Sequence, residues 1–404
     1  MKVSIIGQGY VGLSLAVRAA EVGHLVVGYD SDDKIVSQLL LGNTHIPDVN
    51  IQSLKKLLMN GTYCPSADPK SIKDSEIIII AVPTPLDDKR NPNLEMLRNA
   101  AIQISEVVER STLIVNESTS YPGTLRNVIK DLIENKTSIK HLYAAAPERI
   151  DPGNPIWQLS NTPRVLGAIT NDALKFALEF YETICSTIYT VSDPETAEAS
   201  KLFENTFRHV NIALVNEFAM ISKALSFSAT EAINASATKP FGFMPFLPSV
   251  GVGGHCIPVD PSYLSYASSK AGVAAKFIEL ANSINIGMTH YIVDEIVTRF
   301  EGSIENVSIQ LAGIAYKSGV PDLRESPAIE LLLNLRGKGA KVSWHDPLVG
   351  QWNNEISQDL DSMIDLGIIV SPHKQISFEI WRTRGVQVID LSATSENFGW
   401  PKFF

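Results

Sequence analysis

The alternation of apolar and polar positions at the start of the chain predicts a strand, a helix and a second strand. A β-branched run covers Lys2–Ile6, helical apolar spacing continues to about Val22, and a second run over 24–30 ends on Asp30. Glycines at positions 7, 9 and 12 lie between the first strand and the helix. Strand, glycine turn, helix, strand and acid in this order are typical of a unit that binds a dinucleotide.

Each glycine of this turn has its own physical task. Gly7 permits the tight turn, Gly9 permits close approach of a pyrophosphate, and Gly12 lets the helix pack on the strand. Asp30 is placed to accept hydrogen bonds from an adenosine ribose and to repel a 2′-phosphate. We therefore predict NAD rather than NADP as the cofactor; a glycine-rich turn without a ligand is the alternative.

Further apolar runs predict more strands over 76–82, 112–116 and 141–146, each followed by turn residues. Helical spacing separates these runs, which is typical of a doubly wound parallel sheet. Ligands of such sheets bind beyond the carboxyl ends of the strands, and Thr119 and Glu148 fall at that edge.

The pattern changes after Val191. The stretch 194–225 has helical apolar spacing and no proline or glycine after its first residue, so it predicts one long helix. Lys201 and Asn205 share a face of this helix. From spacing alone, the preferred interpretation is a solvated face with local pairs such as Glu204 with Arg208. The apolar face of the helix predicts burial against a twin helix, hence a homodimer or a higher homo-oligomer.

A second strand–helix–strand pattern lies near the C-terminus. A strand is expected over 307–312, a helix that begins at Ser326-Pro327 with a polar cap, and a strand over 341–345. The predicted fold class is α/β, with two Rossmann-like doubly wound parallel-sheet domains joined by a central long helix and helical domain. The expected domains are an NAD-binding domain over 1–192, a central domain over 193–298 and a nucleotide-binding domain over 299–404.

Composition narrows the possible partners. The chain of 404 residues has a formal net charge of −10, which argues against non-specific nucleic-acid binding. The longest apolar run, around 77–82, ends at Pro83 and is shorter than the roughly 20 residues of a membrane span. The first residues could pass for a signal peptide, but the glycine spacing argues against it. Three cysteines fit a reducing compartment, so we predict a cytoplasmic protein without a membrane partner.

Candidate chemistry centres on the stretch SVGVGGHCIPVDP at 249–261. A thiol beside several glycines can be a small buried apolar group. With a nicotinamide cofactor it is also the nucleophile needed to oxidise an aldehyde, through a thiohemiacetal and a thioester. His255 is interpreted as a loop-packing residue, and its adjacency to Cys256 without a second ligand cluster argues against a metal site.

Taken together, the motifs resemble the UDP-glucose/GDP-mannose dehydrogenase family over essentially the whole chain. The motifs are Gly7-Gln8-Gly9-Tyr10-Val11-Gly12, Val82-Pro83-Thr84-Pro85, Glu117-Ser118-Thr119, Ala146-Pro147-Glu148-Arg149, Lys201-Leu202-Phe203-Glu204-Asn205, Gly253-Gly254-His255-Cys256, Gly313-Ile314-Ala315-Tyr316-Lys317 and the segment 322–327. The resemblance implies oxidation of the 6-hydroxyl of a nucleotide sugar to a carboxylate in two NAD-dependent steps.

The resemblance also implies roles for individual residues. Cys256 resembles the nucleophile, and Lys201 with Asn205 resembles the group that stabilises the alkoxide and the oxyanion. Asp260 and Thr119 resemble a pair that holds a water, and Glu148 resembles the base of thioester hydrolysis. For the cofactor, the implied contacts are Gly7, Gly9, Tyr10, Val11, Gly12, Asp30, Lys34, Pro83, Thr84, Ser118, Thr119 and Arg324. For the UDP-sugar, they are Glu148, Arg149, Ile150, Lys201, Asn205, Lys239, Phe246, Gly251, Gly253, Gly254, Tyr316 and Lys317.

The choice of sugar rests on two segments. The run Lys239-Pro240-Phe241-Gly242-Phe243 resembles members that act on UDP-N-acetylglucosamine, and the segment 147–154 resembles the N-acetylhexosamine branch of the family rather than its glucose branch. UDP-N-acetylmannosamine, UDP-N-acetylgalactosamine and UDP-glucose are the alternatives. Ser249-Val250 departs from the family's usual Gly-Pro, and the β-branched side chain is expected to narrow the substrate loop. A two-electron hydroxyacid dehydrogenase and a non-catalytic nucleotide-binding regulator are the alternative functions.

Overall fold

The computed structural model describes residues 1–404 except positions 47, 152–153, 155 and 395. The described chain folds as two compact units. The first unit comprises Met1–Glu204 and Ser262–Val273, and the second comprises Asn205–Pro261 and Ala274–Phe404. The expected central domain over 193–298 contributes to both units, and the three-domain division stays a prediction.

The described part of the first unit contains an eight-stranded sheet of order β3-β2-β1-β4-β5-β6-β7-β8. Its strands are β1 (Lys2–Ile6), β2 (Leu25–Tyr29), β3 (Tyr63–Ser66), β4 (Ile77–Ile80), β5 (Leu113–Asn116), β6 (Leu142–Ala145), β7 (Arg164–Ala168) and β8 (Ile188–Thr190). The pairs from β3 to β6 are parallel, which confirms the doubly wound sheet. Strand β7 pairs antiparallel to β6, and β8 pairs parallel to β7, which was not predicted from the sequence.

Helices cover both faces of this sheet. They are α1 (Tyr10–Glu21), α2 (Asp33–Leu40), α3 (Ile51–Met59), α4 (Glu95–Val107), α5 (Asp131–Glu134) and α6 (Asn171–Ile184), with a 3₁₀ turn at Pro69–Ile72 and a π-helical turn at Leu125–Lys130. All four residues of β4 are buried isoleucines, as expected for a strand covered on both faces. The strand order reverses between β1 and β4, and the crevice at such a reversal is where ligands of these sheets bind.

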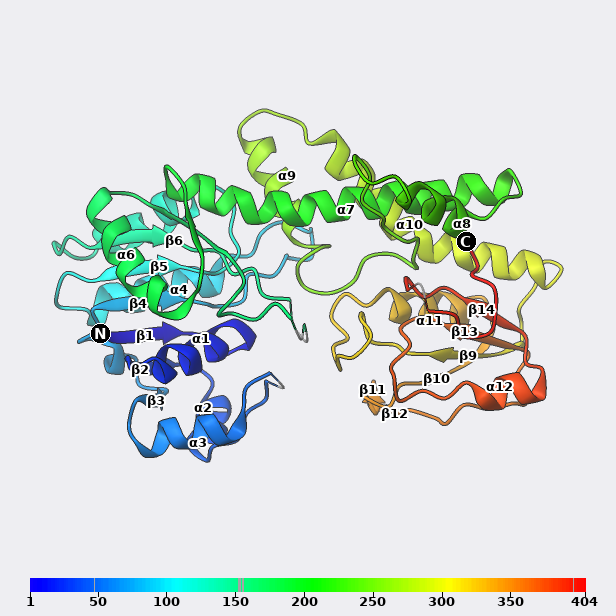
Figure 1. Ribbon diagram of the computed structural model, residues 1–404, viewed down its shortest axis with the longest axis horizontal. Coiled ribbons are helices and arrows are strands. Elements are labelled where there is room, and N and C mark those ends of the chain that lie inside the picture. The colour runs from blue at the N-terminus through cyan, green and yellow to red at the C-terminus, as the bar shows by residue number, and fades with distance from the viewer. Residues whose placement is uncertain (47, 152–153, 155, 395) are drawn as a thin grey trace. The chain divides into compact units, whose positions relative to one another are not determined.

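Helix α7 (Pro194–Ala224) confirms the single long helix predicted from the sequence. It is the uninterrupted green helix of Figure 1. The suggested ion pair of Glu204 with Arg208 was wrong. Glu204 instead forms an ion pair with Arg149, with 2.7 Å between Oε1 of Glu204 and Nη2 of Arg149. The loop that follows β6 therefore competes for this side chain.

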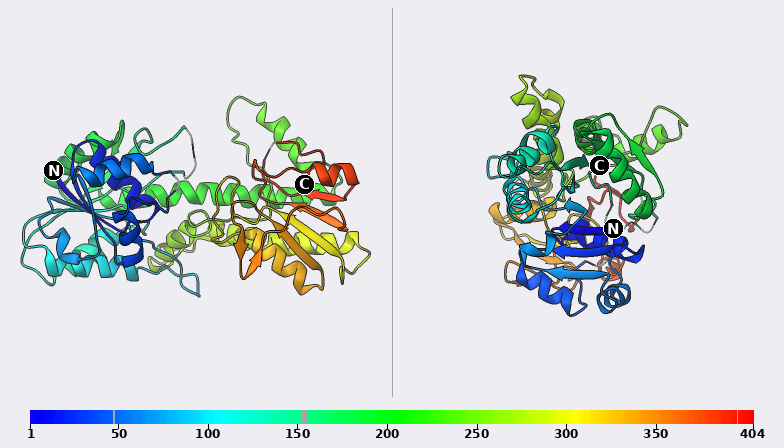
Figure 2. Two further views of the ribbon diagram at one scale, coloured as in Figure 1. Left: turned by 90° about the horizontal axis from the view of Figure 1, so that it is seen from below. Right: turned by 90° about the vertical axis from the view of Figure 1, so that its left-hand side faces the viewer.

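The described part of the second unit contains a four-stranded parallel sheet of order β10-β9-β13-β14. Its strands are β9 (Ser308–Ala312), β10 (Lys341–His345), β13 (Leu366–Ile369) and β14 (Val388–Asp390). The helices are α8 (Ala229–Ala237), α10 (Lys276–Arg299), α11 (Pro327–Gly337) and α12 (Glu379–Arg384), while α9 (Asp260–Lys270) contributes to both units. Figure 2 shows this sheet in yellow to red with its helices alongside. The second Rossmann-like unit is thus confirmed.

Two details of the second unit, the hydrogen bond of Ser326 at the start of α11 and a short hairpin, were not predicted from the sequence. Helix α11 begins after Ser326 with Pro327 in its first turn, but the Ser326 hydroxyl does not cap it. That hydroxyl donates to the carbonyl of Ile314 over 2.7 Å and so ties the helix start to the loop after β9. A short hairpin, β11 (Gln351–Trp352) with β12 (Glu355–Ile356), turns through Asn353 and Asn354 at positive φ, a conformation that asparagine tolerates.

Candidate active site

The glycine turn after β1 has the geometry of a dinucleotide site. Gly7 has φ +90°, and a Cβ there would lie 2.5 Å from the carbonyl oxygen of Ala81. A Cβ on Gly12 would lie 1.8 Å from the carbonyl oxygen of Gly7, so both positions exclude a side chain. A Cβ on Gly9 would meet no atom within 4 Å, and no side chain caps the start of α1. An anion can therefore approach the first-turn N–H groups of α1, beside Tyr10 and Val11, so these residues fit a pyrophosphate.

Asp30 follows β2, and its carboxylate already accepts two backbone hydrogen bonds. Its Oδ2 accepts the backbone N–H of Gln8 over 2.7 Å, and its Oδ1 accepts that of Asp32 over 2.9 Å. An ionised carboxylate has about four acceptor positions, so capacity remains for ribose hydroxyls. Lys34 is exposed on α2, where its backbone N–H donates to Asp32. These positions fit the NAD contacts expected from the sequence.

The carboxyl ends of β4 and β5 are held together by a serine. The Ser118 hydroxyl accepts the N–H of Val82 over 2.9 Å and lies 3.3 Å from the carbonyl of Ile80. Pro83 and Thr84 follow, and the carbonyl of Thr84 accepts the hydroxyl of Tyr263 over 2.9 Å. The Ser118 side chain thus fixes the strand ends, while Thr119 is half-buried next to it. Cofactor contacts of Ser118 and Thr119 stay predictions.

Glu148, which follows β6, is a buried carboxylate with strong partners. Its Oε1 accepts the N–H groups of Arg149 and Ile150 over 2.6 and 2.7 Å. Its Oε2 accepts Nη2 of Arg164, the first residue of β7, over 2.6 Å. Burial alone would raise the pKa of Glu148, but the Arg164 charge, its hydrogen bonds and Lys201 hold that pKa below its ordinary value. About one acceptor position of the carboxylate remains for a water.

A second buried carboxylate shares the same arginine. Nη1 of Arg164 lies 2.9 Å from Oε2 of Glu117, which follows β5. The hydroxyl of Tyr181 on α6 donates to Oε1 of Glu117 over 2.5 Å. Burial raises the pKa of Glu117 to about 7, against the opposing effect of Arg164. One guanidinium therefore serves two carboxylates whose proton affinities differ.

Lys201 approaches the same segment from α7. Its ammonium donates to the main-chain carbonyl of Glu148. Arg149 is held by the Glu204 ion pair and by a 2.7 Å hydrogen bond to the carbonyl of Pro163. The segment after β6 is thus bound by Lys201 and Glu204 of α7 and by Arg164 of β7. Within the first unit, the structure brings together two of the residues expected to be catalytic, Lys201 and Glu148.

Cys256 lies in the second unit, immediately before α9. Its carbonyl accepts the N–H of Asp260 over 2.8 Å, which closes the turn that begins the helix. Its thiol is half-exposed and lies 2.9 Å from Nδ1 of His255. Nδ2 of Asn205 donates to the buried carboxylate of Asp260 over 2.6 Å. Asn205 and Asp260, two further expected catalytic residues, are therefore in direct contact.

The glycine loop before Cys256 packs against the segment expected to bind the nucleotide. A Cβ on Gly253 would lie 2.8 Å from Cβ of Tyr316, and one on Gly254 would lie 2.8 Å from the Tyr316 ring. The N–H of Gly254 donates to the carbonyl of Arg324 over 3.1 Å. Gly251 has φ +140°, with the carbonyl of Asn285 near its missing side chain. These glycines allow close approach of the loop to protein, in addition to any approach to a ligand.

Ser249 and Val250 do not narrow the loop as the sequence led us to expect. Val250 is buried in the core of the second unit with Met288 and Ile292. The Ser249 hydroxyl donates to the carbonyl of Gly251 over 2.8 Å. The expectation of a narrowed loop was therefore wrong, because the β-branched side chain points into the core.

Two other expected substrate contacts lie on exposed or half-buried segments. Lys239 is exposed, with its ammonium 4.9 Å from the ring centre of Phe241. Phe246 is half-buried and packs edge-on against Phe207 at 5.9 Å between ring centres. Their contacts with a sugar stay predictions.

A buried pair fixes the loop that carries Tyr316 and Lys317. Oδ2 of Asp346, at the end of β10, accepts the N–H groups of Ile314 and Ala315 over 2.9 and 3.1 Å. Nε2 of His373 lies 3.0 Å from the same oxygen, and Nδ1 accepts the N–H of Gly319 over 2.9 Å. The loop after β9 is thus held at both ends by the pair. Lys317 itself is half-buried.

Arg324 is held by its neighbour. Its side chain forms an ion pair with Asp322, with 2.5 Å between Nη2 and Oδ2. Hydrogen bonding to Asp322 raises the pKa of Arg324, with smaller contributions that include Tyr316 and Cys256. Arg324 is thus engaged in a local ion pair, and its contact with the cofactor stays a prediction.

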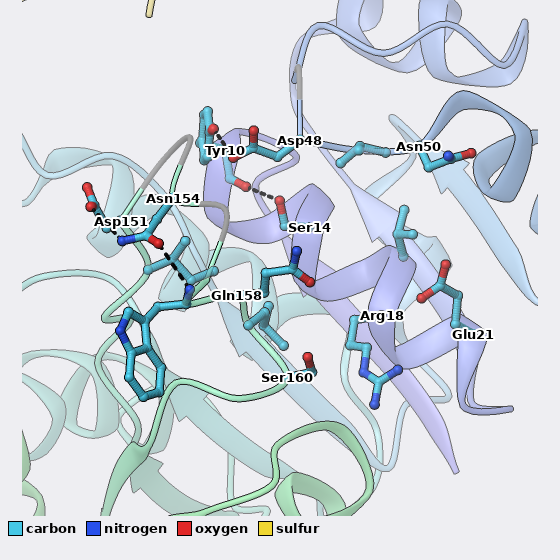
Figure 3. Close-up of a pocket in the computed structure, with 15 residues that line it drawn as sticks. Tyr10, Ser14, Arg18, Glu21, Asp48, Asn50, Asp151, Asn154, Gln158 and Ser160 are labelled. Atoms are coloured by element: carbon cyan, nitrogen blue, oxygen red, sulfur yellow. Dashed lines mark hydrogen bonds between the residues drawn. The ribbon is translucent and has the colours of Figure 1, made fainter. Parts of the chain in front are cut away.

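A cavity of about 490 Å³ runs along α1 in the first unit. Figure 3 shows Ser14, Arg18 and Glu21 on this helix, with Asn50 on one side and Gln158 on the other. Tyr10 and Ile150 are the expected site residues that line it. Tyr10 donates its hydroxyl to Asp48 at one end.

Metal and membrane features were searched over the described residues. Among these residues, no group of three histidine, cysteine or acidic side chains could hold a metal ion. Within the same part of the chain, no helix is both long enough and apolar enough to cross a bilayer.

Sequence reasoning missed Arg164, Glu117, Tyr181, Asp346 and His373. Glu117 was noticed only as part of the motif before Ser118, and His255 was interpreted as packing. A charged residue at the start of an apolar run, such as Arg164, was the available signal, because a buried arginine requires carboxylate partners. Its partners come from other strands and could not be read locally.

Three domain models of one family match the chain in order. The NAD binding domain matches residues 1–185, the central domain matches 195–286, and the UDP binding domain matches 310–381. The chain belongs to the UDP-glucose/GDP-mannose dehydrogenase family. It is an NAD-dependent oxidoreductase that acts on a nucleotide sugar. The family assignment sets aside the hydroxyacid dehydrogenase and the non-catalytic regulator.

Relatives with different sugars match this dehydrogenase almost equally. The UDP-N-acetyl-D-mannosamine dehydrogenase of Pyrococcus horikoshii is 32% identical over 95% of this chain and 92% of its own. The UDP-N-acetyl-D-glucosamine 6-dehydrogenase of Salmonella typhi is 33% identical over 86% of this chain and 83% of its own. The solved UDP-D-ManNAc dehydrogenase structure from Pyrococcus horikoshii has a TM-score of 0.87 at 30% identity, covering 99% of this chain and 98% of that one.

Proposed function

We propose that the protein oxidises the 6-hydroxyl of a UDP-N-acetylhexosamine to the uronic acid in two NAD-dependent steps. Among these sugars, UDP-N-acetylglucosamine is the proposed substrate. Overall, one CH₂OH group, two NAD⁺ and one water give one carboxylate, two NADH and three protons. The observation that carries the proposal is Cys256, a half-exposed thiol held before α9 in a chain that matches both an NAD binding and a UDP binding domain.

The cofactor supplies the chemistry of hydride acceptance when it is bound. Gly7, Gly9 and the start of α1 would hold its pyrophosphate, and Asp30 its adenosine ribose. The ammonium of Lys201 would stabilise the negative oxygen formed when the 6-hydroxyl loses its proton. The Asn205–Asp260 pair would orient a water that carries this proton away.

The second oxidation needs a covalent step on the protein. The Cys256 sulfur adds to the aldehyde carbon, and the carbonyl oxygen takes a proton, which gives a thiohemiacetal. Loss of hydride and a proton converts this adduct to a thioester. Water then attacks the thioester carbon, the C–S bond breaks, and the thiol is regenerated with the carboxylate. Glu148 would accept the proton of that water through its remaining acceptor position.

The sugar is proposed from the segment that begins at Lys239. Relatives named for mannosamine and for glucosamine nucleotides match to 32% and 33% identity, so overall similarity favours neither sugar. The glucosamine proposal therefore rests on the run Lys239-Pro240-Phe241-Gly242-Phe243. Exposed Leu214 and Ile221 on α7 and Phe277 on α10 support the further proposal of a homodimer.

The test supplies limiting UDP-N-acetylglucosamine with excess NAD and counts the NADH formed. Two NADH per sugar supports the full oxidation, and one NADH with a trapped aldehyde would limit the function to the first step. Parallel reactions use the mannosamine, galactosamine and glucose nucleotides. A kcat/KM highest with one of these would move the substrate assignment to that sugar.

A further inference from the structure

We propose that His255 is a catalytic residue that takes the proton of the Cys256 thiol and so prepares the nucleophile. The proposal rests on the proposed function, which gives the thiol its role. Its basis is geometric: Nδ1 of His255 lies 2.9 Å from Sγ of Cys256. An imidazole nitrogen at this distance is an acceptor for the thiol proton when the ring is neutral and carries its own proton on Nε2.

The surroundings of His255 favour charge separation. Burial alone would raise the pKa of the Asp322 carboxyl, but Arg324 holds that pKa below its ordinary value, and a positive charge on nearby His255 adds to the lowering. That carboxylate therefore stabilises an imidazolium at position 255. Cys256 is then the nucleophile, His255 is its base, and Asp322 stabilises the charge that the base acquires.

Arg324 is a second cation in this neighbourhood and the main competing explanation. Interaction with a thiolate at Cys256 contributes to the raised pKa of Arg324, after the larger effect of Asp322. An arginine cannot accept a proton, so it could favour the thiolate but could not act as its base. His255 and Arg324 thus both act on the thiol directly, while Asp322 acts on both of these cations and the Tyr316 hydroxyl acts on Arg324.

The backbone holds this arrangement in place. The N–H of Gly254 donates to the carbonyl of Arg324, and the N–H of Tyr316 donates to the carbonyl of Asp322 over 2.9 Å. On the other side, the carbonyl of Cys256 accepts the N–H of Asp260. The residues on either side of His255 and Cys256 are thus fixed, as a general base must be relative to its nucleophile.

The chemical step is balanced. The proton of S–H moves to Nδ1 of His255, and the sulfur electron pair forms the C–S bond to the aldehyde carbon. The π pair of the carbonyl moves to its oxygen, which takes that proton from the imidazolium, so that the net change is addition of the thiol across C=O and His255 is neutral again. During hydrolysis the C–S bond breaks, and the departing sulfur takes one of the two protons that the attacking water gives up, which restores the thiol. No oxidant beyond NAD is needed.

The test measures alkylation of each cysteine by iodoacetamide from pH 5.5 to 9.5, without substrate, and reads each site by peptide mass spectrometry. Cys64 is exposed and serves as an internal reference in the same molecules. The plateau rate at high pH reports access to a thiol, whereas the pH of half-maximal rate reports its proton affinity. Variants are His255→Gln and, as a matched control, His290→Gln at an exposed histidine on α10.

In the wild type, Cys256 should reach half-maximal rate at a lower pH than Cys64. In His255→Gln, the Cys256/Cys64 rate ratio at pH 6.5 should fall by at least about tenfold, because an unassisted thiol is only about 1% ionised there. His290→Gln should match the wild type. An unchanged ratio in His255→Gln, with a change in Arg324→Gln instead, would overturn the role of His255.

Measuring NADH formation as well as thiol alkylation distinguishes a failure of this inference from a failure of the proposed function. His255→Gln should form the aldehyde but make the second NADH roughly 100-fold more slowly. If no UDP-sugar yields NADH while the thiol titration behaves as predicted, the proposed function fails and the histidine–thiol pair stands. If two NADH form and His255→Gln changes neither the titration nor the second rate, only the inference fails.

Discussion

Arg164 donates from Nη2 to Oε2 of Glu148 over 2.6 Å, and both side chains are buried. Because Lys201 binds the carbonyl of the same glutamate, the ion pair fixes the position of the lysine as well as the carboxylate. Proton transfer and oxyanion stabilisation in the proposed reaction therefore depend on one short segment after β6.

Replacing Glu148 by glutamine should slow thioester hydrolysis by about 10²-fold or more, because the amide cannot take the proton of water. Both hydride transfers precede hydrolysis, so a burst of two NADH per active site should appear before a slow steady rate. Rapid-mixing absorbance measures this burst. Glu198→Gln is the matched control, since Glu198 is equally buried but bonds Gly123 and Leu125. The absence of a burst in Glu148→Gln, or the same slowing in Glu198→Gln, would contradict the assignment.

Glu117 should make stability depend on pH. Burial raises its pKa from 4.5 to about 7, so the folded state holds its proton more tightly than the unfolded state. The stability contribution is then complete below about pH 4.5 and is lost as pH rises through 7. Glu117→Gln lacks this loss, so its free energy of unfolding relative to wild type should rise by about 3 kcal/mol between pH 4.5 and 8. Urea unfolding across that range checks it, and parallel curves would contradict it.

Local pattern predicted most elements but not their long-range partners. Lys2–Ile6, Lys341–His345 and the long helix were predicted because hydrophobic period and turn residues are encoded locally. The antiparallel direction of β7 was not, because a short apolar run carries no direction.

In the candidate site, too, local motifs were predicted and long-range contacts were not. Cys256 and Lys201 could be named from motifs, whereas the contacts of Arg164 join residues far apart in sequence. The packing of Gly254 on Tyr316 was also hidden, because glycine spacing indicates a close approach but not what approaches.

Lys201→Met should lower kcat by about 10²- to 10³-fold with a small change in the KM of the sugar, because the lost charge stabilises an oxyanion that is fully formed only during reaction. Steady-state kinetics measure the split. Lys175→Met, at an exposed lysine on α6, is the control and should keep wild-type values. A rise confined to KM would assign Lys201 to substrate binding alone.

Asp30→Asn should raise the KM of NAD roughly tenfold and leave kcat nearly unchanged, because a ribose contact weakens without touching the reacting atoms. The preference for NAD over NADP should shrink as well, since the charge that repels a 2′-phosphate is gone. Asp33→Asn, at the exposed start of α2, is the control. An unchanged NAD/NADP ratio in Asp30→Asn would place the ribose elsewhere.

The central claim is that Cys256 carries the sugar between the second oxidation and hydrolysis. The most direct measurement is mass spectrometry of cysteine-containing peptides after acid quench of Glu148→Gln turning over UDP-N-acetylglucosamine with NAD. The account predicts an acyl adduct of the nucleotide sugar on Cys256 and none on Cys64 or Cys185. Formation of two NADH per sugar with all three thiols unmodified throughout the time course would contradict it.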